Sequence, residues 1–220
     1  MKLIWSPETA SKAYIDTVKS CEKLRESGVP ELLSAMAAGW DAKLIVESWS
    51  HGTPIATSLG LAMAARHTGG RHVCIVPDER SRLEYIKATR NAGVPVMPEV
   101  VVGEEATVAV LAGVDFLVVD CKRKDFTRVL RRAKVSPRGA VFACKNASQR
   151  NLSGFRWHGV VERGTRVVRS VFLPVGKGLD IAHLGYGGGS ASVGSSIKKG
   201  PSRWIKHVDQ KSGEEHLFRE

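Results

Sequence analysis

Several features common in other proteins are scarce in this sequence of 220 residues. Its cysteines, Cys21, Cys74, Cys121 and Cys144, never form the CxxC spacing of zinc sites and redox pairs, so we expect reduced, structural thiols. The N-terminus lacks a secretory apolar segment, and the most apolar window, 108–119, is too short to span a bilayer. We therefore expect an intracellular protein, cytoplasmic or nuclear.

Several catalytic and binding motifs are also missing. The sequence contains no GxSxG, HExxH or GxxxxGK[ST] pattern, which argues against nucleophile-elbow hydrolases, zincins and nucleoside triphosphatases. It also carries no RNA-stacking strand motif and no DNA-reading motif. These absences leave small-molecule chemistry and nonspecific charge contacts as the remaining classes of function.

Charge is present in excess and is unevenly distributed. The formal net charge is +11, and residues 122–138 contain eight basic residues against one acid, Asp125. If residues 123–133 form a helix, its apolar residues lie on one stripe and its basic residues on a solvated face. The alternative is a weak contact with a polyanion, which would be sensitive to salt. The residues that would make this contact are Lys124, Arg128, Arg131 and Arg132.

The chain is organised around residues 43–78. An apolar strand (43–47) is followed by a small polar turn, an Ala/Leu-rich helix (54–67), a second strand (72–76) and Asp78. This order of elements places ligands over strand ends and a helix N-terminus.

The alternation of strands and helices continues downstream. With 43% hydrophobic and 25% charged residues, the chain can build one sizeable core, and the pattern predicts a doubly wound α/β sheet that ends in an antiparallel hairpin. We expect one domain over 1–185, with N-terminal helices within 7–38, and a flexible Gly/Ser-rich basic tail over 186–220. The further strands are expected at 99–103, 114–120, 140–144, 167–174 and 179–184, and the further helices at 81–91, 105–111 and 123–133.

Several segments resemble a known group of enzymes. Glu47 at the end of strand one, Ala92-Gly93-Val94, Gly103-Glu104-Glu105-Ala106, the strand 116–120 and the hairpin sequence 169–179 are similar to small S-adenosylmethionine-dependent O-methyltransferases of the catechol and caffeoyl-CoA type. More narrowly, the whole chain resembles a plant family of uncharacterised proteins placed in that superfamily. The resemblance implies a Rossmann-like class I methyltransferase fold with a seven-stranded, mostly parallel sheet and a reversed final strand.

The resemblance also implies a set of cofactor-binding residues. These are Glu47, Gly52, Asp78, Glu105 and Ala106. The chain departs from the family in the turn after strand one, where only Gly52 remains of several glycines and Trp49 is close enough to fill the cofactor path. It also departs at the end of strand two, where Val76 stands in place of the acid that binds the ribose.

The family's metal site is altered as well. Asp120 and Asn146 match two of its residues, but Lys145 replaces a paired Asp and Lys122 replaces a further acid. Two ammonium groups oppose Mg²⁺ binding, so we expect no metal. Lys145 either takes the place of the cation or is a solvated lysine at a strand end. In the first case it would pair with Asp120 and either polarise a substrate oxygen or bind a carboxylate or phosphate.

Two functional hypotheses follow. The first is a methyltransferase of the O-methyltransferase type, metal-independent if active, acting on a small or acidic acceptor near Asp120, Lys145 and Asn146. We expect its S-adenosylmethionine binding to be weak or absent. The second is a catalytically silent relative that serves as an interaction or anion-binding module through its basic face and tail. Fold analogy does not choose between them, so whether the protein is an enzyme stays open.

Overall fold

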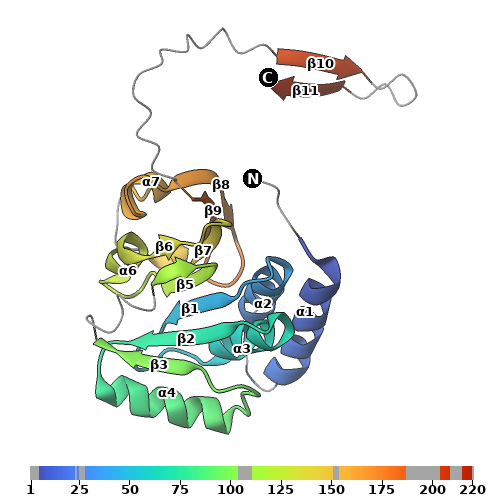
Figure 1. Cartoon of the computed structure of the whole chain (residues 1–220). Helices are drawn as coiled ribbons and strands as arrows, with labels where there is room; N and C mark the ends of the chain where they lie inside the picture. Colours follow the sequence, from blue (N-terminus) through green and yellow to red (C-terminus); the bar gives the residue numbers. More distant parts are fainter. Residues whose placement is uncertain are drawn as a thin grey trace. The chain divides into compact units, whose positions relative to one another are not determined.

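A computed structural model describes residues 5–22, 24, 28–103, 111–150 and 154–186, and the backbone of 204–208 and 215–219. The chain divides into two units, Met1–Gly188 and Gly189–Glu220. Figure 1 shows the described helices and strands along the chain. In this described part, no helix has the length and apolar character needed to cross a membrane.

The first unit alternates strands with helices. Its described helices are α1 (Pro7–Cys21), α2 (Val29–Gly39), α3 (Ala56–Thr68), α4 (Glu79–Asn91), α6 (Phe126–Arg132), η1 (Ala147–Gln149) and α7 (Trp157–Val160). Its strands are β1 (Leu44–Ser48), β2 (Arg71–Val76), β3 (Glu99–Val102), β4 (Ala112–Val114), β5 (Phe116–Asp120), β6 (Lys134–Val135), β7 (Ala140–Lys145), β8 (Arg166–Leu173) and β9 (Leu179–Gly185).

Seven of these strands form one sheet in the order β3-β2-β1-β5-β7-β9-β8. The strands from β3 to β7 pair in parallel, and β9 runs antiparallel to both β7 and β8. Short β4 and β6 pair separately. The predicted doubly wound fold with a reversed final strand is therefore confirmed.

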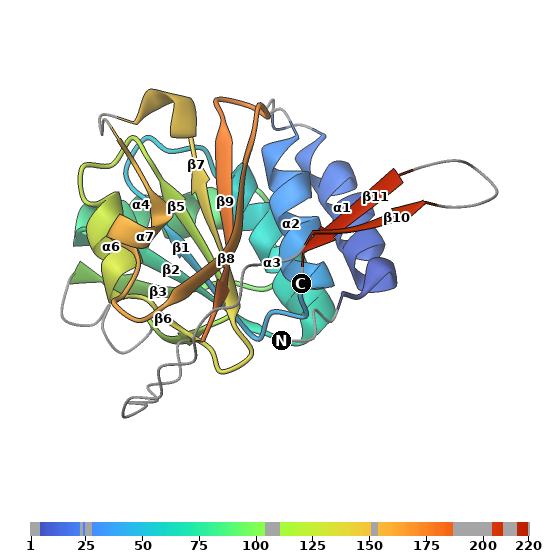
Figure 2. The same ribbon diagram turned by 90° about the horizontal axis from the view of Figure 1, so that it is seen from above.

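Apolar side chains on both faces of the central strands explain why helices cover the sheet on two sides. Alternate residues of β5 divide between the two layers: Phe116 and Val118 pack with α1, α2 and α3, whereas Leu117 and Val119 pack with α6 and α7. Figure 2 shows α1–α3 on one side and α6 with α7 on the other. Burial on both faces is typical of parallel strands and accounts for their nearly continuous hydrophobic sequences.

Two helices begin at the polar residues that cap them. Ser6 Oγ accepts a hydrogen bond from Thr9 N at 3.4 Å at the start of α1, as the sequence predicts. Asp78 Oδ1 accepts one from Ser81 N at 2.7 Å, so α4 begins two residues earlier than the expected 81–91.

The expected strand 114–120 is divided at Asp115. The Asp115 carboxylate is buried, and its Oδ2 accepts hydrogen bonds from the backbone N–H groups of Lys43 at 2.9 Å and Leu44 at 3.0 Å. These contacts satisfy two donors at the start of β1. The acid that interrupts the apolar run therefore anchors a neighbouring strand.

The hairpin β8–β9 is joined by a turn that docks on η1. Ala147 N donates to Gly178 O at 2.9 Å, and Ser148 N donates to Lys177 O at 3.1 Å. Gly178 has φ +85°, and a Cβ there would lie 2.5 Å from Ser148 Oγ. Glycine therefore permits both the backbone conformation and the close approach.

The second unit contains a β-hairpin of its own. Strands β10 (Trp204–Val208) and β11 (Glu215–Arg219) pair antiparallel within the segment for which the sequence predicts a tail. We predicted no strands there, because the preceding Gly/Ser-rich stretch dominated the composition.

Candidate functional site

The carboxyl ends of β5 and β7 bring the predicted catalytic residues together. Asp120 and Lys145 are register partners at the last paired position of these parallel strands, and Asn146 follows Lys145 directly. The carboxyl edge of an open α/β sheet is where such folds bind ligands.

The Asp120 carboxylate is buried and held by two donors. Its Oδ1 accepts hydrogen bonds from Asn146 Nδ2 at 2.8 Å and from the backbone N–H of Lys122 at 2.9 Å. Asn146 has φ +57°, a left-handed conformation that Asn tolerates better than most residues. The loops after both strands are thus joined through one carboxylate oxygen.

Lys145 is buried although it ends a strand. Only 8% of the residue is exposed, and its Nζ donates to Thr57 Oγ1 at 3.4 Å. No ion pair within 4.0 Å joins it to Asp120 or to any other acid that the structure describes, so the direct pairing considered from the sequence is wrong. Its burial distinguishes it from a lysine on the open surface of a strand end.

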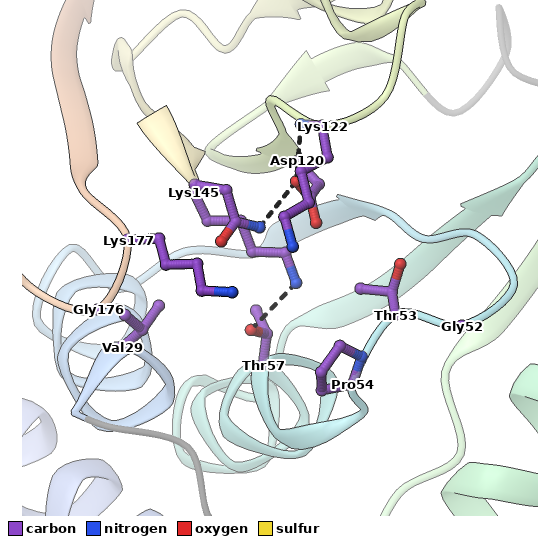
Figure 3. A pocket seen from close by; sticks show the side chains of 11 residues that line it. Val29, Gly52, Thr53, Pro54, Thr57, Asp120, Lys122, Lys145, Gly176 and Lys177 are labelled. Carbon is purple, nitrogen blue, oxygen red and sulfur yellow. Dashed lines mark hydrogen bonds between the residues drawn. The ribbon is translucent and has the colours of Figure 1, made fainter. Parts of the chain in front are cut away.

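These residues line a cavity of about 390 Å³, which we call the lysine cavity (Figure 3). Its lining residues are Val29, Gly52, Thr53, Pro54, Thr57, Asp120, Lys122, Lys145, Asn146, Gly176 and Lys177. They come from the start of α2, the turn after β1, the first turn of α3, the ends of β5 and β7, and the β8–β9 turn. Its volume falls within the usual range of small-molecule sites.

The charge of the lysine cavity is positive. Three lysines, Lys122, Lys145 and Lys177, line it against one carboxylate, that of Asp120. The N-terminus of α3 adds the positive end of a helix dipole, and no side-chain hydrogen bond caps this end in the described part of the chain. The arrangement can therefore bind a carboxylate or phosphate group.

The turn after β1 supplies Gly52 to this cavity. Gly52 has φ +76°, and no atom of the described residues lies within 4 Å of the position of a Cβ there. Trp49 is buried beside Tyr85 rather than in the lysine cavity, with ring centroids 5.3 Å apart. The Trp49 ring, which we expected to be close enough to fill the cofactor path, therefore does not fill the lysine cavity.

Glu47 lies beneath this turn and does not line the cavity. Its Oε1 accepts a hydrogen bond from Tyr85 Oη at 2.6 Å and lies 3.2 Å from His72 Nε2. Burial raises the pKa of Glu47, but the contacts with His72 and Tyr85 outweigh burial and leave that pKa below its ordinary value. The geometry thus places Glu47 in a buried polar network, and its cofactor role stays a prediction.

The other predicted cofactor residues lie elsewhere. Asp78 is exposed and caps α4, so its side chain serves a helix start, and Glu105 and Ala106 lie outside the described residues. Among the described residues, no three His, Cys, Asp or Glu side chains gather where they would hold a metal ion. The absence of a metal accordingly stays an expectation.

Sequence reasoning missed two contributors to the site, Thr57 and Lys177, which both line the lysine cavity. A signal existed for Lys177, because it lies between two glycines in the hairpin turn that carries the family resemblance. Its distance of 32 residues from Lys145 hid their proximity.

The fold is that of the S-adenosylmethionine-dependent O-methyltransferases. TomG from Streptomyces achromogenes, solved with S-adenosylmethionine, is 21% identical over 83% of this chain and 92% of its own, with a TM-score of 0.53. The O-methyltransferase from Bacillus cereus, solved with S-adenosylhomocysteine, is 17% identical over 83% and 93%, with a TM-score of 0.51. A methyltransferase from Geobacter sulfurreducens is 18% identical over 81% and 90%, with a TM-score of 0.53.

The sequence itself defines a narrower group. Residues 1–220 match the family described as "Protein of unknown function (DUF1442)", and the chain belongs to this family. No curated protein sequence matches the chain. The chain is therefore a methyltransferase-like protein by fold, and its own chemistry must be argued from its site.

Proposed function

We propose that this methyltransferase-like protein binds a small anionic molecule, a carboxylate or a phosphate ester, in the lysine cavity. The observation that carries the proposal is the burial of Lys145, whose ammonium group has one long hydrogen bond, 3.4 Å to Thr57, within the described residues. An ammonium can donate three hydrogen bonds, and a buried charge is costly unless it is paired. A bound anion would supply the missing acceptors.

The other charges of the cavity support the same class of ligand. Lys122 and Lys177 reach it from two further loops, and Asp120 already accepts two protein hydrogen bonds. An anion at the open N-terminus of α3 would also gain from the helix dipole. The site thus offers donors from four separate elements.

S-adenosylmethionine fits this cavity poorly. Its sulfonium is a cation, and the lysine cavity surrounds its own single carboxylate with three lysines. Asp78, the expected ribose contact, caps α4 instead. We therefore favour the anion-binding hypothesis over methyl transfer, which the fold favours by analogy alone.

The test is the binding of inorganic phosphate, measured as a change in the melting temperature. Ionic strength is kept constant, and chloride serves as the reference anion. Phosphate should raise the melting temperature saturably, because a ligand that binds only the folded state stabilises it by mass action. Lys145→Gln and Lys177→Gln should each weaken binding about 10- to 100-fold, since a hydrogen bond to a charged group contributes about 1.5–3 kcal/mol.

The matched control is Lys87→Gln, which removes an exposed lysine on α4. It should respond to phosphate as the wild type does. If phosphate binding weakened equally in all three variants, the loss of net positive charge alone would explain the effect, and the proposal would be refuted. Low-micromolar binding of S-adenosylmethionine, with methyl transfer to a carboxylate, would restore the methyltransferase hypothesis.

A further inference from the structure

The order of strands in the sheet reverses between β1 and β5. The chain moves outward from β1 to β2 and β3, then returns to β5 on the other side of β1. Ligands of open α/β sheets bind in the crevice outside the carboxyl ends at such a switch point. In this protein, Trp49 directly follows β1, and Arg123 lies in the loop after β5.

Arg123 bridges this crevice. Its Nη1 donates to the backbone oxygen of Trp49 at 2.6 Å, while its Nε and Nη2 donate to the two carboxylate oxygens of Asp125 at 2.8 and 2.6 Å. Only 9% of the Arg123 side chain is exposed. A bidentate carboxylate pair fixes the plane of a guanidinium, so the bridge is held in place from the β5 side.

The other end of the bridge is also anchored. Trp49 N donates to Ile75 O at 2.9 Å, and Trp49 Nε1 donates to Thr53 O at 3.1 Å. The indole packs edge-on against Tyr85. The backbone carbonyl that Arg123 binds therefore belongs to a turn that is hydrogen-bonded to β2, is closed by an internal hydrogen bond and packs against α4.

Arg123, at one end of the bridge, also lines a second cavity. This cavity of about 150 Å³, the arginine cavity, is lined by the end of β2 with the residue after it (75–77), by Gly103 and by residues in and before α6 that include Arg123 and Asp125. It shares no lining residue with the lysine cavity. Two neighbours in the chain therefore face different cavities, Lys122 the lysine cavity and Arg123 the arginine cavity.

We infer that Arg123 is a specificity-determining residue that closes the switch-point crevice and keeps an adenosyl cofactor from spanning it. A ligand with a nucleoside at one end and an amino acid at the other needs a continuous crevice across the ends of β2, β1 and β5. The Arg123–Trp49 bridge interrupts that crevice, while the lysine cavity stays accessible to a small anion. This inference rests on the bridge and on its place at the switch point, and it does not depend on anion binding in the lysine cavity.

The experiment uses S-adenosylhomocysteine as the probe, because its thioether has no sulfonium charge and repulsion by the lysines does not decide the outcome. Titration calorimetry compares the wild type with Arg123→Ala and Asp125→Asn, the latter retaining the arginine but removing its charged partner. We expect no saturation by the wild type in the high-micromolar range, at least tenfold tighter binding by Arg123→Ala and a smaller gain by Asp125→Asn.

Arg138→Ala is the matched control, since Arg138 also pairs with carboxylates, those of Asp41 and Asp115, but lies before β7 at the opposite edge of the sheet. It should bind the probe as the wild type does. Tight binding by the wild type that weakens in Arg123→Ala would make Arg123 a cofactor contact and overturn the inference. The inference would also be overturned if neither Arg123→Ala nor Asp125→Asn bound S-adenosylhomocysteine, provided that circular dichroism shows both variants to be folded.

Phosphate binding separates this inference from the proposed function. Arg123 does not line the lysine cavity, so Arg123→Ala should bind phosphate within about twofold of the wild type. Suppose that neither the wild type nor any variant binds phosphate, while Arg123→Ala binds S-adenosylhomocysteine more tightly than the wild type does. The anion site would then be refuted, and the inference about Arg123 would stand.

Discussion

Replacing Gly178 with Ala tests how tightly the β8–β9 turn is packed against η1. A Cβ at Gly178 would lie 2.5 Å from Ser148 Oγ and 2.8 Å from Phe172 Cζ, both too close for real contacts. The φ of +85° adds the cost of a left-handed conformation, about 1–2 kcal/mol for a residue with a Cβ. Overpacking contributes about 1–3 kcal/mol more, which gives a total loss of about 2–5 kcal/mol.

The control for this substitution is Gly164→Ala. Gly164 has φ +89°, and no atom of the described residues lies within 4 Å of its added Cβ, so it carries the backbone cost without the clash. The two variants should therefore differ by about 1–3 kcal/mol in the free energy of unfolding, measured by urea denaturation. Phosphate binding should also weaken in Gly178→Ala only, because Lys177 precedes it. Equal destabilisation by both substitutions would refute the close packing of Gly178 against Ser148 and Phe172.

Four further predictions concern buried groups and charge. Glu47→Ala should lower the free energy of unfolding by about 1–3 kcal/mol in urea denaturation, since it leaves the buried Tyr85 hydroxyl without its acceptor; an unchanged free energy of unfolding would contradict the network. The hydrogen bond and charge of Arg123 hold the pKa of Asp125 below its ordinary value. The Asp125 carboxylate therefore contributes stability that is present above about pH 3.9 and is lost as the pH falls through its lower pKa in the folded protein. In Arg123→Ala the Asp125 pKa should rise, as followed by carboxyl NMR, and an unchanged titration would count against the pairing. Burial raises the pKa of Cys74 and Cys144 well above the ordinary value, so iodoacetamide at pH 8 should modify them only after unfolding, and rapid modification of the native protein would be inconsistent with that burial. We further propose a weak polyanion contact through the exposed basic residues around α6, so that heparin retention should fall with salt and fall again in a variant with four Gln substitutions; identical elution of variant and wild type would exclude it. That variant replaces Lys124, Arg128, Arg131 and Arg132.

The fold was largely predictable because local patterns and the family resemblance agreed. The run 116–120 gave a buried strand, and the glycine-rich turn between 173 and 179 gave the antiparallel hairpin. The division at Asp115 was not predictable, since its carboxylate serves backbone donors 71 and 72 residues away. A local sequence pattern does not identify hydrogen-bond partners so far away in the chain.

The site was predictable at strand ends and much less so in loops. Asp120, Lys145 and Asn146 follow parallel neighbours, so topology alone brings them together. The burial of Lys145 depends on Thr57 and on the hairpin turn, and the bridge from Arg123 to Trp49 joins two loops 74 residues apart. Side-chain directions in loops follow from tertiary packing, which periodicity does not describe.

The position of β9 between β7 and β8 has a consequence for folding during synthesis. When β8 leaves the ribosome, the sheet position next to β7 is still empty, because the strand that fills it is the last of the seven to be made. The edge of β7 then exposes unpaired backbone groups that can join another nascent chain. The turn carrying Lys177 also reaches its place only when β9 inserts, so the lysine cavity is the last part of the domain to assemble. We therefore expect ribosome-bound chains long enough to release β8 but not β9 to aggregate and to show no response to phosphate. Chains long enough to release β9 should stay soluble and respond to phosphate.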